Sequence, residues 1–64
     1  MIDHDIELRL LLTPVEALAL AQFAKRATFD TFRDRAVSED EASAMHDAIS
    51  VAAMALASVG FAPR

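Results

Sequence analysis

Hydrophobic and polar residues alternate near the start of the chain, where positions 6–12 are Ile-Glu-Leu-Arg-Leu-Leu-Leu. Successive side chains of an extended chain point to opposite sides, so the even-numbered residues share one face. The pattern therefore predicts a β-strand over residues 6–12. A single strand cannot satisfy its own backbone donors and acceptors. We therefore expect it to pair with a partner, and a second copy of the chain is the partner we favour.

A change to helical spacing follows at once and predicts a first helix over residues 14–26. Thr13 and Glu16 can accept hydrogen bonds from each other's amides, which is the arrangement called a capping box. Pro14 fits the first helical position, where its missing N–H costs nothing. The apolar residues recur at helical spacing and predict a buried stripe made of Leu20, Phe23, Ala24 and Ala27.

Two more helices are predicted, a short one over residues 29–36 and a long one over residues 39–59. Ser38 and Glu41 match a second capping box in front of the long helix. Gly60 directly follows that helix, which is typical of a left-handed residue that ends a helix with Phe61 folding back onto the last turn.

The long predicted helix carries two apolar strips. The first is spaced like a coiled-coil seam and contains Ala42, Met45, Ile49, Ala52, Leu56 and Val59. The second contains Ala44, Ala48, Val51, Met54 and Ala55. A helix that is apolar around so much of its circumference is usually buried on two sides, and in so short a chain we expect one side to be a subunit interface.

The predicted fold is thus a single small domain, mainly α with one N-terminal β-strand, in the order strand, helix, short connecting helix, helix. We expect a homodimer formed by strand pairing, by the second apolar strip, or by both. The candidate interface residues are Ile6, Leu8, Leu10, Val51, Met54 and Ala55.

Size and composition support association. A chain of 64 residues builds only a small core, and such chains usually need disulfides, a metal or a partner subunit. There is no cysteine, which excludes disulfides and thiolate metal sites.

The apolar run at residues 51–57 is too short to span a bilayer, and the start of the chain has no basic region of a signal peptide. We therefore expect a soluble, cytoplasmic protein that does not enter the membrane.

Catalytic signatures are missing from the sequence, which contains no glycine-rich phosphate loop, zinc spacing or nucleophilic serine motif. His46 and Asp47 are adjacent on a predicted helix, so their side chains point about 100° apart and form no dyad. The Asp3-His4-Asp5 cluster is interpreted as a solvated chain end rather than a metal site. We expect no enzymatic activity and no cofactor.

The charged clusters also have simple interpretations. The acids at 39–41 suit the first turn of a helix, where the helix dipole favours negative charge. The basic residues are interleaved with Asp30 and Asp34, which indicates a solvated mixed-charge face made of Lys25, Arg26, Arg33 and Arg35. The net charge of −4 argues against nonspecific DNA binding, which needs a basic surface.

Four motifs carry a family resemblance, namely Leu12-Thr13-Pro14, Ala-Leu-Ala-Gln-Phe at 19–23, Asp40-Glu41-Ala42 with Met45, and the ending Gly-Phe-Ala-Pro-Arg at 60–64. With these motifs, most of residues 12–64 resembles a group of short uncharacterised bacterial and phage-associated proteins. The resemblance implies an accessory protein of a mobile element that works by binding.

The order strand, helix, helix also resembles the ribbon-helix-helix fold of small dimeric repressors, in which two paired strands enter the major groove. This resemblance covers residues 6–26 and implies that Glu7, Arg9 and Leu11 face the bases, with Arg9 as the candidate DNA contact. A glutamate and a leucine are poor readers of bases, so we do not expect nucleic acid to be the main partner.

The favoured hypothesis is a non-catalytic protein-binding accessory protein, concretely a phage-type, anti-CRISPR-like inhibitor of a host defence complex. Its expected partners are a second copy of the chain and a host or phage protein. The alternative is a ribbon-helix-helix-like dimeric DNA-binding regulator. A third possibility is a purely structural assembly piece.

Overall fold

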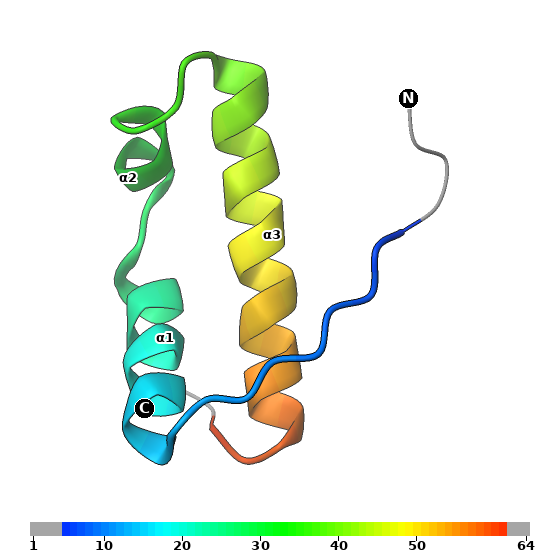
Figure 1. The fold of residues 1–64 in the computed structure, drawn as a ribbon. Helices are drawn as coiled ribbons and strands as arrows, with labels where there is room; N and C mark the ends of the chain where they lie inside the picture. Colours follow the sequence, from blue (N-terminus) through cyan, green and yellow to red (C-terminus); the bar gives the residue numbers. More distant parts are fainter. Residues whose placement is uncertain (1–4, 62–64) are drawn as a thin grey trace.

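Three helices make up the framework of residues 5–61. The computed structural model describes residues 5–61 and contains α1 (Pro14–Arg26), α2 (Phe29–Arg33) and α3 (Glu39–Ser58). α1 and α2 follow each other along one side of α3 and run in the opposite direction to it (Figure 1). The fold is therefore a helical hairpin in which the long α3 faces two shorter helices.

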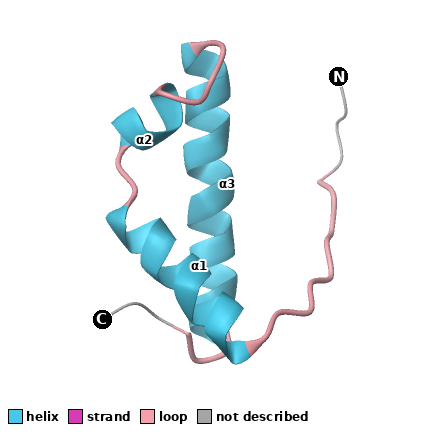
Figure 2. Ribbon diagram, turned by 60° about the vertical axis from the view of Figure 1, so that its left-hand side comes forward, coloured by secondary structure: helices cyan, strands magenta, loops and turns pink. Residues whose placement is uncertain are grey.

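Residues 5–13, which we name the arm, form an extended segment rather than a strand. Within the described part of the chain, Figure 2 shows helices and loops but no strand. The prediction of a β-strand over residues 6–12 is therefore wrong, and with it the β-α-α fold class. An extended segment becomes a strand only when a second strand takes up its backbone hydrogen bonds. The remainder of the described chain is helix, turn and loop, so nothing in it can do so.

The start of α1 confirms the predicted capping box. The Thr13 amide donates to Oε1 of Glu16 at 2.9 Å, and the Glu16 amide donates to Oγ1 of Thr13 at 3.1 Å. Thr13 is extended, with φ −67° and ψ 159°, and Pro14 occupies the first turn. These local bonds fix the point at which the arm enters α1.

The start of α3 differs from the prediction in one bond. The Glu41 amide donates to Oγ of Ser38 at 3.1 Å, as a capping box requires. The Glu41 carboxylate, however, accepts from the amide of Val37 at 2.9 Å instead of from the amide of Ser38. This hydrogen bond from Val37 connects the loop before α3 to the first turn of the helix.

The end of α3 is a complete Schellman motif. Gly60 has φ +98°, the Gly60 amide donates to the Ala57 carbonyl at 3.1 Å, and the Phe61 amide donates to the Leu56 carbonyl at 2.9 Å. This confirms the predicted role of Gly60, because only glycine adopts such a φ without strain. Phe61 turns back and packs against the core cluster that contains Leu56.

The core is thin and lies between α1 and α3. Ala17 and Ala21 pack against Leu56, and Leu20 and Phe61 cover them in part. The predicted seam of α3 does face the shorter helices, with Ala42 and Leu56 buried and Met45, Ile49 and Ala52 half-buried, while Val59 is exposed. No buried polar or charged side chain occurs among residues 5–61.

The predicted stripe of α1 is partly wrong. Phe23 was expected in the core but is 44% exposed, and Ala17 and Ala21 are the buried residues of this helix. Two small alanines allow α1 to approach α3 closely. The larger Phe23 ring instead lies at the edge of the interface, where it meets the buried Phe32 ring edge to face at a centroid distance of 6.3 Å.

α2 is shorter than the predicted helix over residues 29–36. The Phe32 carbonyl accepts from the amides of both Arg35, at 3.1 Å, and Ala36, at 2.9 Å. Because one carbonyl accepts from two amides, the regular helical hydrogen bonding ends here and the chain turns toward α3.

In the described part of the chain, no helix is both long enough and apolar enough to cross a membrane.

Candidate binding groove

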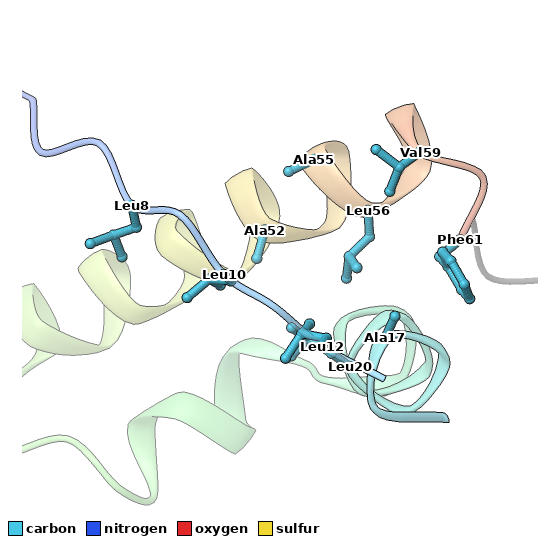
Figure 3. Close-up of a pocket in the computed structure, with 10 residues that line it drawn as sticks. All are labelled: Leu8, Leu10, Leu12, Ala17, Leu20, Ala52, Ala55, Leu56, Val59 and Phe61. Atoms are coloured by element: carbon cyan, nitrogen blue, oxygen red, sulfur yellow. The ribbon is translucent and has the colours of Figure 1, made fainter. Parts of the chain in front are cut away.

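An apolar groove of about 320 Å³ lies between the arm, α1 and the C-terminal half of α3. The arm contributes one wall, the core-facing residues of α1 contribute the floor, and α3 with Phe61 contributes the other wall (Figure 3). The side chains that line it are all apolar and belong to Leu8, Leu10, Leu12, Ala17, Leu20, Ala52, Ala55, Leu56, Val59 and Phe61.

The alternation of the arm produces its wall of the groove. Leu8, Leu10 and Leu12 occupy alternate positions and all line the groove, as side chains on one face of an extended segment must. Leu11 lies between two of them in sequence, does not line the groove and is 102% exposed. The even-numbered face predicted from the sequence is therefore present at positions 8, 10 and 12, although the segment is not a strand.

The groove is open to solvent. Leu8 is 74% exposed, Leu10 65% and Val59 70%, whereas Leu56 on the α3 wall is 8% exposed. Burial of apolar surface is favourable at about 25 cal/mol per Å². The leucines of the arm thus present unburied apolar surface that another molecule can cover.

Three of the six predicted interface residues line the groove, and the other three do not. Leu8, Leu10 and Ala55 line the groove. Val51 and Met54 are 60% and 66% exposed and are not part of the groove lining. Ile6, on the arm, is 72% exposed and also does not line the groove. The alternative DNA contact, Arg9, is exposed on the arm.

Sequence reasoning missed the part of the groove that depends on folding. Ala17 and Leu20 come from α1, and Phe61 arrives only because Gly60 reverses the chain. The return of Phe61 onto the end of the long helix was predicted from Gly60, but its place in the groove was not. No sequence signal places the arm beside Ala52 and Ala55.

His46 and Asp47 contact each other, although their adjacent positions on α3 predicted side chains that point about 100° apart. The Nδ1 atom of His46 lies 3.4 Å from Oδ1 of Asp47, and both side chains are exposed. The His46 ring meets the Phe32 ring edge to face at 5.9 Å, and its backbone carbonyl accepts from Oγ of Ser50 at 3.0 Å. The side chain contacts its helix neighbour and an aromatic ring, which suits a packing residue at the edge of the core.

Among residues 5–61, no three His, Cys, Asp or Glu side chains lie together in a way that could hold a metal ion. Asp3 and His4 of the predicted solvated end lie outside the described residues.

Two of the acids at the start of α3 contact residues that precede the helix. Glu39 lies 3.6 Å from Arg33, and Glu41 accepts from the Val37 amide.

Arg33, one of the basic residues of the predicted mixed-charge face, has acidic and aromatic neighbours. Arg33 lies 3.7 Å from Asp30 and 3.6 Å from Glu39, and its guanidinium is 5.3 Å from the centre of the Phe29 ring. All three charged side chains are exposed, so Arg33 shares a solvated surface with the two carboxylates.

Comparison with known proteins places the chain in a family but assigns it no activity. No curated protein and no solved structure matches the chain. The profile of DUF7706, a family of unknown function, matches residues 1–64. This agrees with the expected resemblance to short uncharacterised proteins, whereas the expected link to phages stays a prediction. Because the match covers the whole chain, the protein belongs to the DUF7706 family.

Proposed function

We propose that the protein is a non-catalytic accessory protein that binds another polypeptide in the apolar groove between the arm, α1 and α3. The observation that supports this proposal is the pair of leucines at positions 8 and 10, which line an apolar groove while 74% and 65% of each residue remains exposed. Exposed contiguous apolar surface in a soluble domain usually marks an interaction site.

The chemistry of the groove defines the kind of partner. Because its lining has no charged side chain, charge does not select the ligand. The volume of about 320 Å³ is suited to a few apolar side chains presented together. An amphipathic helix that offers residues at spacings of three and four meets this requirement, since it lays its apolar face into a groove.

The narrower hypothesis of a phage-type, anti-CRISPR-like inhibitor is one form of this proposal, with a subunit of a host defence complex as the partner. It draws on the small size, the acidity and the resemblance described above.

The ribbon-helix-helix alternative depended on a strand at residues 6–12, so we do not develop it further. Accordingly, Arg9 has no proposed role in DNA contact.

Affinity capture from lysate of the source cells tests the proposal with a matched pair of arm variants. Leu10→Ser removes a leucine that lines the groove, and Leu11→Ser removes its exposed neighbour. We expect a stoichiometric protein partner with the wild type and with Leu11→Ser, and its loss with Leu10→Ser at unchanged helical circular dichroism. Equal recovery with both variants, or no stoichiometric partner with the wild type, contradicts the proposal.

A further inference from the structure

We propose that the outward face of α1 binds an amphipathic helix of a partner protein, and that this helix begins with acidic residues. The surface, which we name the α1 face, forms an open hollow of about 460 Å³. It lies on the opposite side of α1 from Ala17, which is buried in the core cluster with Leu56. The α1 face is separate from the groove, so this second interaction goes beyond the proposed function. The residues that line it are Val15, Leu18, Ala19, Gln22, Phe23 and Arg26.

Most of the α1 face is apolar and open to solvent. Val15 is 78% exposed, Leu18 48% and Phe23 44%. Residues at helical spacing share one side of a helix, so these side chains form a stripe rather than isolated exposed positions. A contiguous apolar stripe indicates an interaction site, whereas single exposed apolar residues are normal on a surface. A facing helix that offers its own apolar stripe covers such a surface.

The charge at the C-terminal end of the α1 face defines the chemistry of the partner. Arg26 lines the hollow, and Lys25 lies beside it in the last turn of α1. Neither cation forms an ion pair with another of residues 5–61. No acidic residue lines the hollow, and the nearby Glu16 carboxylate accepts from the Thr13 amide. The two cations can therefore pair with carboxylates of a partner, and a basic partner is disfavoured.

The net charge of the chain does not prevent this contact. The whole chain carries −4, so an acidic partner is repelled at long range. At physiological salt the Debye length is about 8 Å, so charges farther than this from the contact are largely screened. The cations of the α1 face are at the contact itself and therefore decide which charge the partner carries there.

The position of the cations also sets the direction of the partner helix. Acidic residues are most favourable in the first turn of a helix, where they complement its dipole. The first turn of the partner therefore lies against Arg26, and its apolar stripe runs back toward Val15. This places the partner antiparallel to α1. Val15 and Arg26 are about 16 Å apart along the helix axis, so the contact extends over about three turns.

Two synthetic peptides test the chemistry of the partner. Both are alanine-rich helices of about 18 residues, because shorter isolated helices are marginal in water. Both carry leucines at spacings of three and four, and they differ only in the first turn, which has glutamates in one peptide and glutamines in the other. Each is titrated into the full chain, and the amide NMR shifts of individual residues locate the contact and give the Kd.

Two arginine variants provide a matched control. Arg26→Gln removes a cation of the α1 face, and Arg35→Gln makes the same change at an exposed arginine outside it. For the wild type we expect shifts at Leu18 and Gln22 and a Kd about two- to fivefold lower for the glutamate peptide, as exposed ion pairs give. This preference should fall toward one in Arg26→Gln and persist in Arg35→Gln, with unchanged helical circular dichroism in both.

Several results would overturn the proposal. These are equal Kd values of the two peptides for the wild type, a preference that Arg26→Gln leaves unchanged, and no binding of either peptide. Shifts confined to Leu8 and Leu10 would also overturn it, because they place the peptide in the groove. The capture experiment with the arm variants is independent of these outcomes, so the two proposals can fail separately.

Discussion

Leu56→Ala is the sharpest test of the core. Leu56 is 8% exposed and is the largest side chain in the cluster with Ala17 and Ala21. Removing its three outer carbons costs about 2.5 kcal/mol at about 0.8 kcal/mol per buried group. Buried leucine-to-alanine changes cost about 2–5 kcal/mol in total. We expect a value in the lower half of this range, because Leu20 and Phe61 are only partly buried and can move into the space.

The assay is urea unfolding followed by helical circular dichroism, at one fixed protein concentration because association shifts apparent stability. A loss of about 2.5–3 kcal/mol is a large part of the roughly 3–10 kcal/mol expected for a chain of this length. Ile49→Val, at a half-buried seam position, provides a milder variant that should cost about 0.5–1.5 kcal/mol.

Leu11→Ala is the matched control, since it removes the same atoms from a fully exposed leucine of the arm. We expect no measurable change in the free energy of unfolding. Alanine is the best helix former, so a loss at Leu56 cannot be explained by helix propensity. Equal and small effects of Leu56→Ala and Leu11→Ala would refute the assignment of the core to the face between α1 and α3.

Three further predictions concern the helix ends and the surface charges. Thr13→Ala should lower the free energy of unfolding by about 1 kcal/mol, because it removes the acceptor for the Glu16 amide; an unchanged urea midpoint would contradict the role of the cap. Gly60→Ala should cost about 1–2 kcal/mol through the strain of φ +98° alone, since a Cβ there meets no atom within 4 Å, and thermal unfolding measures the loss. Arg33→Ala should change stability by less than about 1 kcal/mol, because its bridges to Asp30 and Glu39 are exposed; a larger loss in urea unfolding would show that these bridges hold α2 to α3.

Local sequence signals determined the helices of this protein. The caps at Thr13 and Ser38 and the stop at Gly60 each act within five residues, so they could be recognised without any tertiary structure. The seam of α3 was equally predictable, because its spacing of three and four places one face of the helix against whatever packs on it.

Tertiary structure decided what the alternation at residues 6–12 became. Alternation places side chains on two faces of an extended segment, and it correctly put Leu8 and Leu10 on one face. The alternation does not indicate whether a second strand is present to form the backbone hydrogen bonds of a sheet. Because no second strand lies beside the arm in the described part of the chain, the segment lines a groove together with Ala52 and Ala55 instead of forming a sheet.

Tertiary structure also decided which face of α1 is buried. Periodicity alone allowed a stripe through Phe23, but close packing on α3 selected the alanines at 17 and 21 and left the Phe23 ring at the edge. The reason is geometric, since the distance between two helix axes depends on the side chains of both helices and cannot be obtained from the pattern of one. The sequence alone thus determined where α1 and α3 begin and which residue stops α3, whereas the packing of the helices determined the groove.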